Sequence, residues 1–199
     1  MKVKIKKEGK VKEFKLISSW EEVTLEKWLQ LIDFETGTKT EEATETIAAL
    51  SDIPKKLVKE LALSDVANIM SKVAELQQKQ DTKLKRIIEI NDIEYGFHPD
   101  LDSISLGEYA DIEQFIKNGI DKQLPELMAV LYRPIKEKKN DIYIIDAYDG
   151  DIRLRTEEMK QMSAQQVQSA LVFFYTLGKV LSEILPLYLM EKLKETKTQ

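Results

Sequence analysis

Residues 125–148 read PELMAVLYRPIKEKKNDIYIIDAY, and they pass from a helical to an alternating pattern. Apolar residues recur at helical spacing up to Leu131, and Pro134 forbids further helix because its nitrogen carries no hydrogen. A lysine-rich loop follows, and alternation returns at 141–148. We therefore predict a helix, a loop and a short strand. Arg133 needs no functional role in this interpretation, because the helix dipole favours a cation in the last turn.

The bulk composition is that of a globular chain. It has 199 residues, of which 43% are apolar and 33% charged, with a formal net charge of −5. That charge argues against non-specific binding of nucleic acid over the whole surface. The absence of cysteine excludes disulfides, thiolate metal sites and thiol nucleophiles. No apolar segment follows the charged N-terminus, so we expect an intracellular protein.

The first 33 residues predict a β-hairpin and a helix. The alternating runs at 2–7 and 11–17 flank a short turn. Their lysines suit a basic arm for nucleic acid or an edge strand protected from aggregation, and the interleaved glutamates favour the second interpretation. Thr24 is the expected N-cap of a helix that buries Trp28. Trp20, just before it, is predicted to pack against this helix or to be an exposed anchor.

Three more helices are predicted between residues 40 and 76. Pro54 suits the first turn of the second helix, and Ser64 is the expected cap of the third. Residues 77–85 lack apolar periodicity and form the expected boundary. We predict an N-terminal unit over 1–80 and a second unit over 85–199, or one continuous domain.

The second half is predicted to combine helices with short antiparallel strands. Asn91-Asp92 lies between two β-rich runs as a two-residue hairpin turn. Ser105 caps a helix, Thr156 opens a short helix, and Ser163 caps a long final helix. The final helix is apolar on more than one side, which indicates burial on several faces or a shared interface. The fold class is therefore α+β, predominantly α-helical.

A membrane span is not predicted. The most apolar stretch, residues 169–192, is interrupted by Lys179, Glu183 and Pro186. It falls short of the roughly 18 uninterrupted apolar residues that a span requires.

Few residues suggest chemistry. His98 is the only histidine, so a histidine metal cluster is impossible. Asp146, Asp149 and Asp151 could supply oxygen ligands to Mg²⁺ or Ca²⁺, although aspartate with glycine is ordinary turn chemistry. The seven glycines are scattered, which excludes a glycine-rich phosphate loop. Acidic residues such as Glu108 are expected on the outer faces of helices. We predict no catalytic residue, no metal and no cofactor.

Several segments together resemble a family. The lead-in W-x-x-V-T-L and the segments IAALSDIP, LGEYADIE, LPELMAVLYRPI and MSAQQVQSALVFFYTLG occur in that order between residues 18 and 190. In this the chain resembles tail-assembly and virion-assembly proteins of tailed bacteriophages. The resemblance implies a non-enzymatic role, as an assembly chaperone or as a structural part of the particle. It also implies other phage proteins as partners, in the host-cell cytoplasm or in the virion.

Three hypotheses follow from the sequence. The first is an assembly protein that binds partners, or a second copy of itself, through the final helix and the Trp20 region. The second is a nucleic-acid-associated regulator that uses the lysine hairpin. The third is a metal-dependent enzyme around the three aspartates, with Arg133 or His98 in support. The partner-binding residues predicted by the first hypothesis are Trp20, Phe173, Tyr175, Val180 and Leu187.

Overall fold

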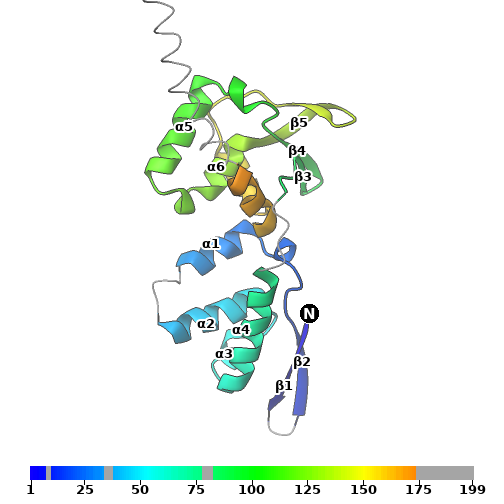
Figure 1. Ribbon diagram of the computed structural model, residues 1–199, viewed down its shortest axis with the longest axis vertical. Coiled ribbons are helices and arrows are strands. Elements are labelled where there is room, and N and C mark those ends of the chain that lie inside the picture. Colours follow the sequence, from blue (N-terminus) through cyan, green and yellow to red (C-terminus); the bar gives the residue numbers. More distant parts are fainter. Residues whose placement is uncertain (8–9, 34–37, 78–82, 174–199) are drawn as a thin grey trace, which may run out of the picture.

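The computed structural model describes residues 1–7, 10–33, 38–77 and 83–173. Its elongated body has two lobes, with the N-terminal hairpin at one end (Figure 1). The elements of the N-terminal lobe are strands β1 (Lys2–Lys7) and β2 (Lys10–Lys15), the 3₁₀ helix η1 (Trp20–Glu22) and helices α1 (Leu25–Asp33), α2 (Lys39–Leu50), α3 (Lys55–Val58) and α4 (Leu63–Gln77).

The hairpin predicted at the N-terminus is confirmed. Strands β1 and β2 pair antiparallel, with Val3 opposite Phe14 and Ile5 opposite Lys12. Val3 and Ile5 are buried, whereas Lys2 and Lys4, at the alternate positions of the strand, are exposed. The alternation of lysine with apolar residues therefore separates a solvated face from one that covers the helices.

The helices of the N-terminal lobe follow the predicted pattern, with one exception. Thr38 and Glu41 form a reciprocal capping box at the start of α2. Ser64, the expected cap of α4, instead lies inside that helix. The carbonyl of Ala62 already accepts hydrogen bonds from the N–H groups of Asp65 and Val66, so the first turn closes before Ser64 can cap it.

The C-terminal lobe combines a four-stranded sheet with helices. Its elements are strands β3 (Ile87–Ile90), β4 (Ile93–Phe97), β5 (Tyr132–Lys139) and β6 (Ile142–Ile145), the 3₁₀ helices η3 (Leu101–Ser103) and η4 (Ile120–Lys122), and helices α5 (Leu106–Lys117), α6 (Leu124–Leu131) and α7 (Arg153–Met159). A further helix begins at residue 164 and is described as far as residue 173. The α+β class is thus confirmed.

The sheet has the order β3-β4-β5-β6, with antiparallel neighbours throughout. The predicted turn between β3 and β4 is confirmed, because Asn91 and Asp92 have φ angles of 51° and 64°. Positive φ at both central residues characterises the type I′ turn, whose twist matches that of the flanking strands. Strands β3 and β6 form the two edges.

The structure corrects the interpretation of residues 132–140. The predicted lysine-rich loop is strand β5, and Arg133 lies in this strand rather than in a last helical turn. Helix α6 ends at Leu131, and Tyr132 is already extended, with φ −112° and ψ 125°. The residue before a proline favours the extended region, and Arg133 precedes Pro134. Pairing with β4 then continues the extended conformation.

Two further helix starts were predicted near the C-terminus. The cap at Ser163 is confirmed: its Oγ accepts a hydrogen bond from the N–H of Gln166 at 3.2 Å. Helix α7 begins at Arg153, however, and not at Thr156. The N–H of Thr156 already donates to the carbonyl of Ile152, within the first turn.

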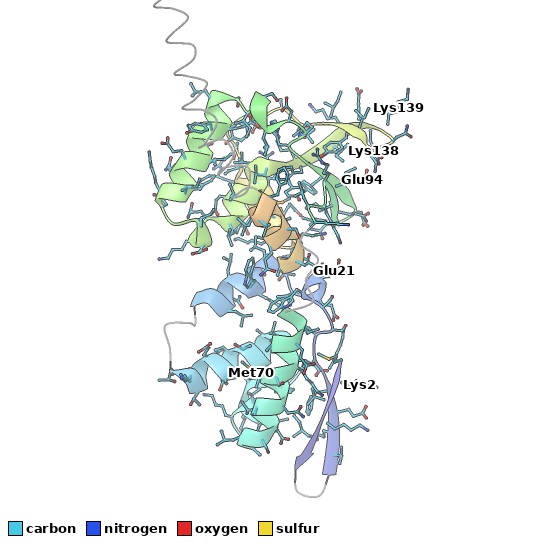
Figure 2. All side chains as sticks on the ribbon, viewed as in Figure 1. Lys2, Glu21, Met70, Glu94, Lys138 and Lys139 are labelled. Atoms are coloured by element: carbon cyan, nitrogen blue, oxygen red, sulfur yellow. The ribbon has the colours of Figure 1, made fainter. Side chains whose placement is uncertain are left out.

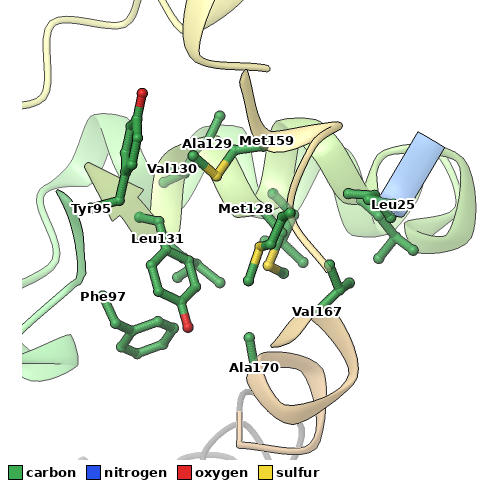
Figure 3. Packing of buried hydrophobic residues seen from close by; sticks show 14 of the residues in the cluster. Leu25, Tyr95, Phe97, Met128, Ala129, Val130, Leu131, Met159, Val167 and Ala170 are labelled. Atoms are coloured by element: carbon green, nitrogen blue, oxygen red, sulfur yellow. The ribbon is translucent and has the colours of Figure 1, made fainter. Parts of the chain in front are cut away.

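Each lobe has its own hydrophobic cluster, but the two clusters exchange residues. Leu25, at the start of α1, is fully buried in the cluster of the C-terminal lobe, where Figure 3 places it near Met128 and Val167. Ala164 is buried in the cluster of the N-terminal lobe. The Leu25 N–H donates to the Met162 carbonyl at 2.7 Å. The lobes are therefore joined by backbone pairing as well as by packing.

Among the described residues, no helix has the length and apolarity needed to cross a membrane.

Candidate functional site

Three ionisable side chains meet inside the C-terminal lobe. Glu108 Oε1 lies 2.8 Å from Arg133 Nη1 and 3.4 Å from His98 Nε2. Each of the three side chains is at least nine-tenths buried. Buried charges of this kind are paired or hydrogen-bonded, because desolvation penalises an isolated charge by several kcal/mol. We call this set the buried ion cluster.

Helix α5 positions Glu108. Ser105 is the N-cap, and its backbone N–H and Oγ donate to Glu108 Oε2 at 2.8 and 2.6 Å. Burial by itself raises the pKa of Glu108, but the hydrogen bonds from Ser105 and the charge of Arg133 outweigh it, joined by the charge of His98 when its imidazole is protonated. The pKa therefore lies below its ordinary value. Glu108 is thus an anion held against a helix N-terminus and a guanidinium.

Strand β5 positions Arg133. It pairs with Gly96 of β4, so its side chain leaves the sheet on the face where Gly96 has no side chain. The Tyr148 ring lies on the guanidinium, with its centroid 5.8 Å from Arg133 Cζ. The Tyr148 hydroxyl donates to Asp111 of α5. Burial lowers the pKa of Arg133, and the Glu108 carboxylate opposes this shift.

His98 directly follows β4. Its backbone N–H donates to the carbonyl of Leu131 at 2.7 Å, which fixes the end of the strand against α6. Burial lowers the pKa of the His98 imidazole, the Glu108 carboxylate opposes this, and Arg133 acts in the same direction as burial. With its pKa below the ordinary value, His98 is neutral at neutral pH.

The buried ion cluster ties α5 to the sheet. Its three residues come from a helix, a strand and the segment after another strand, and the Tyr148 ring lies on the guanidinium of Arg133. Arg133 Nε and His98 Nδ1 have no hydrogen-bond partner within the described chain. A carboxylate, a guanidinium and a neutral imidazole could move a proton, but all three side chains are at least nine-tenths buried, which leaves a substrate little access to them. The arrangement is better explained as a clamp that sets the position of α5.

Sequence reasoning missed the central member of this cluster. Glu108 was expected on the outer face of α5, and Arg133 at a helix end. The spacing of Ser105 and Glu108 is that of a capping box, which identifies a glutamate folded back on the helix start. That signal was present in the sequence, whereas the contact with Arg133 depends on long-range pairing.

The three aspartates do not converge. Asp146 pairs with Lys136 at 3.1 Å, and Asp151 binds the guanidinium of Arg153. Asp149 Oδ1 accepts the backbone N–H of Asp151 at 3.1 Å, as in an ordinary aspartate turn. No group of three or more potential acidic or histidine ligands forms a metal site among the described residues. The aspartate hypothesis required convergence, and this part of the chain does not supply it.

The predicted partner-binding residues have different environments. Trp20 is only 6% exposed and belongs to the N-terminal cluster, so packing replaces the exposed-anchor interpretation. Phe173 packs against the C-terminal cluster, with its ring perpendicular to that of Phe97 at 5.5 Å between centroids. Tyr175, Val180 and Leu187 lie outside the described residues.

A pair of exposed isoleucines marks a different surface. Along β6 the side chains alternate, so Tyr143 and Ile145 are buried while Ile142 and Ile144 are 79% and 57% exposed. Both exposed residues point to one face of an edge strand. The β5–β6 hairpin extends away from the lobe, and Lys139 lies near its tip (Figure 2).

No family model, no curated protein and no solved structure matches the chain.

Proposed function

We propose that the chain is a non-enzymatic assembly protein of tailed-phage type that binds other polypeptides through the outer edge of β6. The observation that carries this proposal is the exposed pair Ile142 and Ile144 on an edge strand. An edge strand presents backbone donors and acceptors, to which an extended segment of another chain can add. Adjacent apolar side chains on one face give such a segment a surface to bury.

The composition of the two hairpins supports this assignment. Proteins commonly protect an exposed edge with charged side chains, and lysine is a frequent choice. The N-terminal hairpin follows that rule, with lysines along β1. In the second hairpin the lysines lie on the inner strand β5, and the edge strand β6 carries isoleucine. The edge of β6 therefore lacks the usual protection against pairing.

The resemblance to phage assembly proteins supplies the biological setting of the proposal. It includes the segment LPELMAVLYRPI, which is α6 and the start of β5. The partners would be tail or capsid components. The C-terminal residues Tyr175, Val180 and Leu187 remain a predicted second contact.

The test is recovery of partners by the tagged chain from cells that co-produce phage tail and capsid proteins. We expect Ile142→Lys/Ile144→Lys to lose recovered components that the natural chain retains. Val11→Lys is the matched control, because Val11 is 58% exposed on the other hairpin. Leu187→Lys tests the C-terminal contact separately. If no phage component is recovered by the natural chain, the proposed function is wrong.

A second candidate is nucleic-acid binding by the N-terminal hairpin, which is favoured by the outward lysine face. However, Glu13 pairs with both Lys2 and Lys4 on that face, at 3.4 and 3.3 Å. An affinity for DNA or RNA that falls steeply with salt, and that disappears in Lys4→Gln/Lys6→Gln, would favour this candidate. No binding at low salt would eliminate it.

A further inference from the structure

We propose that β6 pairs antiparallel with β6 of a second copy of this chain, about a twofold axis at Tyr143. The two sheets then join into one eight-stranded sheet. This inference rests on the proposed function in one respect only, the use of the β6 edge. The partner that it names is a second copy of the chain, so its test needs no phage component.

The backbone of β6 fixes which residues can pair outward. The N–H of Asp146 donates to the carbonyl of Pro134 at 2.9 Å, so Asp146 directs its backbone groups toward β5. Backbone direction alternates along a strand, and residues 142 and 144 therefore also face β5. Tyr143 and Ile145 direct their N–H and C=O groups to the open edge.

One antiparallel register matches both the hydrogen bonds and the side chains. If Tyr143 faces Tyr143 of the second copy, the two residues can exchange both backbone hydrogen bonds. Ile142 then lies opposite Ile144 of the second copy, and the reverse pair follows by symmetry. These are non-hydrogen-bonded pairs, in which the Cα atoms are about 4.5 Å apart and the side chains are closest. The Ile142 and Ile144 side chains of both copies then meet in one cluster.

The neighbouring register is less favourable. If Ile144 faced Ile144 of the second copy, Ile142 would lie opposite Asp146. That register would place an apolar side chain against a carboxylate and would bury only two isoleucines together. A twofold interface requires a self-complementary surface patch. Only the register centred on Tyr143 places both Ile142 and Ile144 opposite isoleucines of the second copy.

The charges around β6 allow two copies to approach. Lys136 is paired with Asp146 at 3.1 Å, and Lys138 with Glu94 at 2.5 Å. The register of the hairpin places Glu137 beside Ile144 and Lys139 beside Ile142. These two opposite charges flank the isoleucines. In the dimer, Ile142 of one copy lies beside Ile144 of the other copy. Lys139 of the first copy flanks this isoleucine pair on one side, and Glu137 of the second copy flanks it on the other side. The contact surface is therefore electrically balanced.

Cysteine pairing tests the register directly, because the natural chain contains no cysteine. We would prepare Ile142→Cys and Ile144→Cys separately, and oxidise each alone and in an equal mixture. The proposed register brings residue 142 of one copy next to residue 144 of the other, within the distance that a disulfide spans. We expect the mixture to give several times more disulfide-linked dimer than either variant alone. Val11→Cys, mixed with each variant, is the control for random collision.

Sedimentation of the natural chain completes the test. We expect a concentration-dependent monomer–dimer equilibrium that Ile142→Lys/Ile144→Lys shifts to monomer. Mixing that variant with Ile142→Glu/Ile144→Glu should restore dimers, because unlike charges then face each other across the axis. Equal disulfide yields in all mixtures, or a natural chain that stays monomeric at high concentration, would overturn the inference.

The outcomes for the two proposals are separable. Partner recovery that depends on Ile142 and Ile144 without self-association would overturn the dimer and leave the assembly function intact. Register-specific disulfides without recovery of any phage component would support the dimer and overturn the assembly function.

Discussion

Arg133 and Glu108 form an ion pair of 2.8 Å between strand β5 and helix α5, with about one-twentieth of each side chain exposed. The two residues are 25 positions apart (133 − 108), and the 3₁₀ helix η4 and helix α6 lie between them in the chain. Such a pair specifies geometry more than it adds net stability, because desolvation offsets much of the attraction. Its energetic signature is a large penalty when only one partner is removed.

Arg133→Met should therefore destabilise the fold by about 3–5 kcal/mol, because it leaves the Glu108 charge buried without its guanidinium. Glu108→Gln removes that charge and keeps an amide that can still complete the capping box. The double variant Glu108→Gln/Arg133→Met should be more stable than Arg133→Met alone. Denaturant unfolding of all four proteins measures this cycle. Strictly additive losses would contradict the pairing.

The pH dependence of stability should have two parts, both of which lower stability on acidification. The pKa of His98 is lowered in the folded protein from 6.5, chiefly by burial, so the unfolded chain binds the proton first. Stability therefore falls as the pH drops below 6.5. Burial raises the pKa of Glu108, but the hydrogen bonds from Ser105, the charge of Arg133 and, in acid, the charge of His98 outweigh it, so this pKa also lies below its ordinary value of 4.5. Its contribution is lost below that pH.

His98→Gln separates the two parts. It should flatten the stability profile between about pH 7.5 and about pH 5.5, and leave the loss in stronger acid. The measurement is the free energy of unfolding in urea at each pH. An unchanged slope in the upper window would show that another group titrates there.

Local signals account for most of the elements that were predicted. The Asn91-Asp92 turn, the cap at Ser105 and the hairpin formed by the runs 2–7 and 11–17 each depend on a few neighbouring residues, and each is present. Strand β5 was missed because its lysines resemble a loop in isolation. Its extended conformation depends on pairing with β4 and β6, which no local pattern of residues 132–139 encodes.

The same distinction holds for the site. The exposed isoleucines on β6 follow from alternation, which the sequence displays, but their position on a sheet edge depends on the strand order. At Trp20 the sequence left packing and an exposed partner-binding anchor open, because this residue lies outside the helical pattern. It fills the N-terminal core, since the connection through η1 turns it inward.

Gly96 should tolerate no side chain. A Cβ at this position would overlap the Tyr143 ring and lie 2.8 Å from Ile145 Cγ2. Tyr143 cannot move away freely, because its hydroxyl donates to the Phe97 carbonyl at 2.6 Å. Gly96→Ala should therefore destabilise the protein by about 1–3 kcal/mol.

Gly107→Ala is the matched control for that substitution. Its Cβ would make an ordinary contact of 3.7 Å with Tyr148, at the start of α5. Alanine also suits a helix better than glycine does, so the change should be neutral or stabilising by up to about 1 kcal/mol. Thermal unfolding of the two variants compares them directly, and equal losses would refute the steric argument at Gly96.

Leu25 should couple the stability of the two lobes. It begins α1 in the N-terminal lobe, yet it is fully buried in the C-terminal cluster. Leu25→Ala should cost about 2–5 kcal/mol and lower the hydrogen-exchange protection of amides in β3 and β4, more than 60 residues away along the chain. Leu31→Ala is the control on the same helix, because Leu31 packs against the N-terminal cluster instead. Its loss of protection should be concentrated in α2 and α4. If Leu25→Ala leaves the β3 and β4 amides as protected as before, the lobes unfold independently and the packing at Leu25 does not join them.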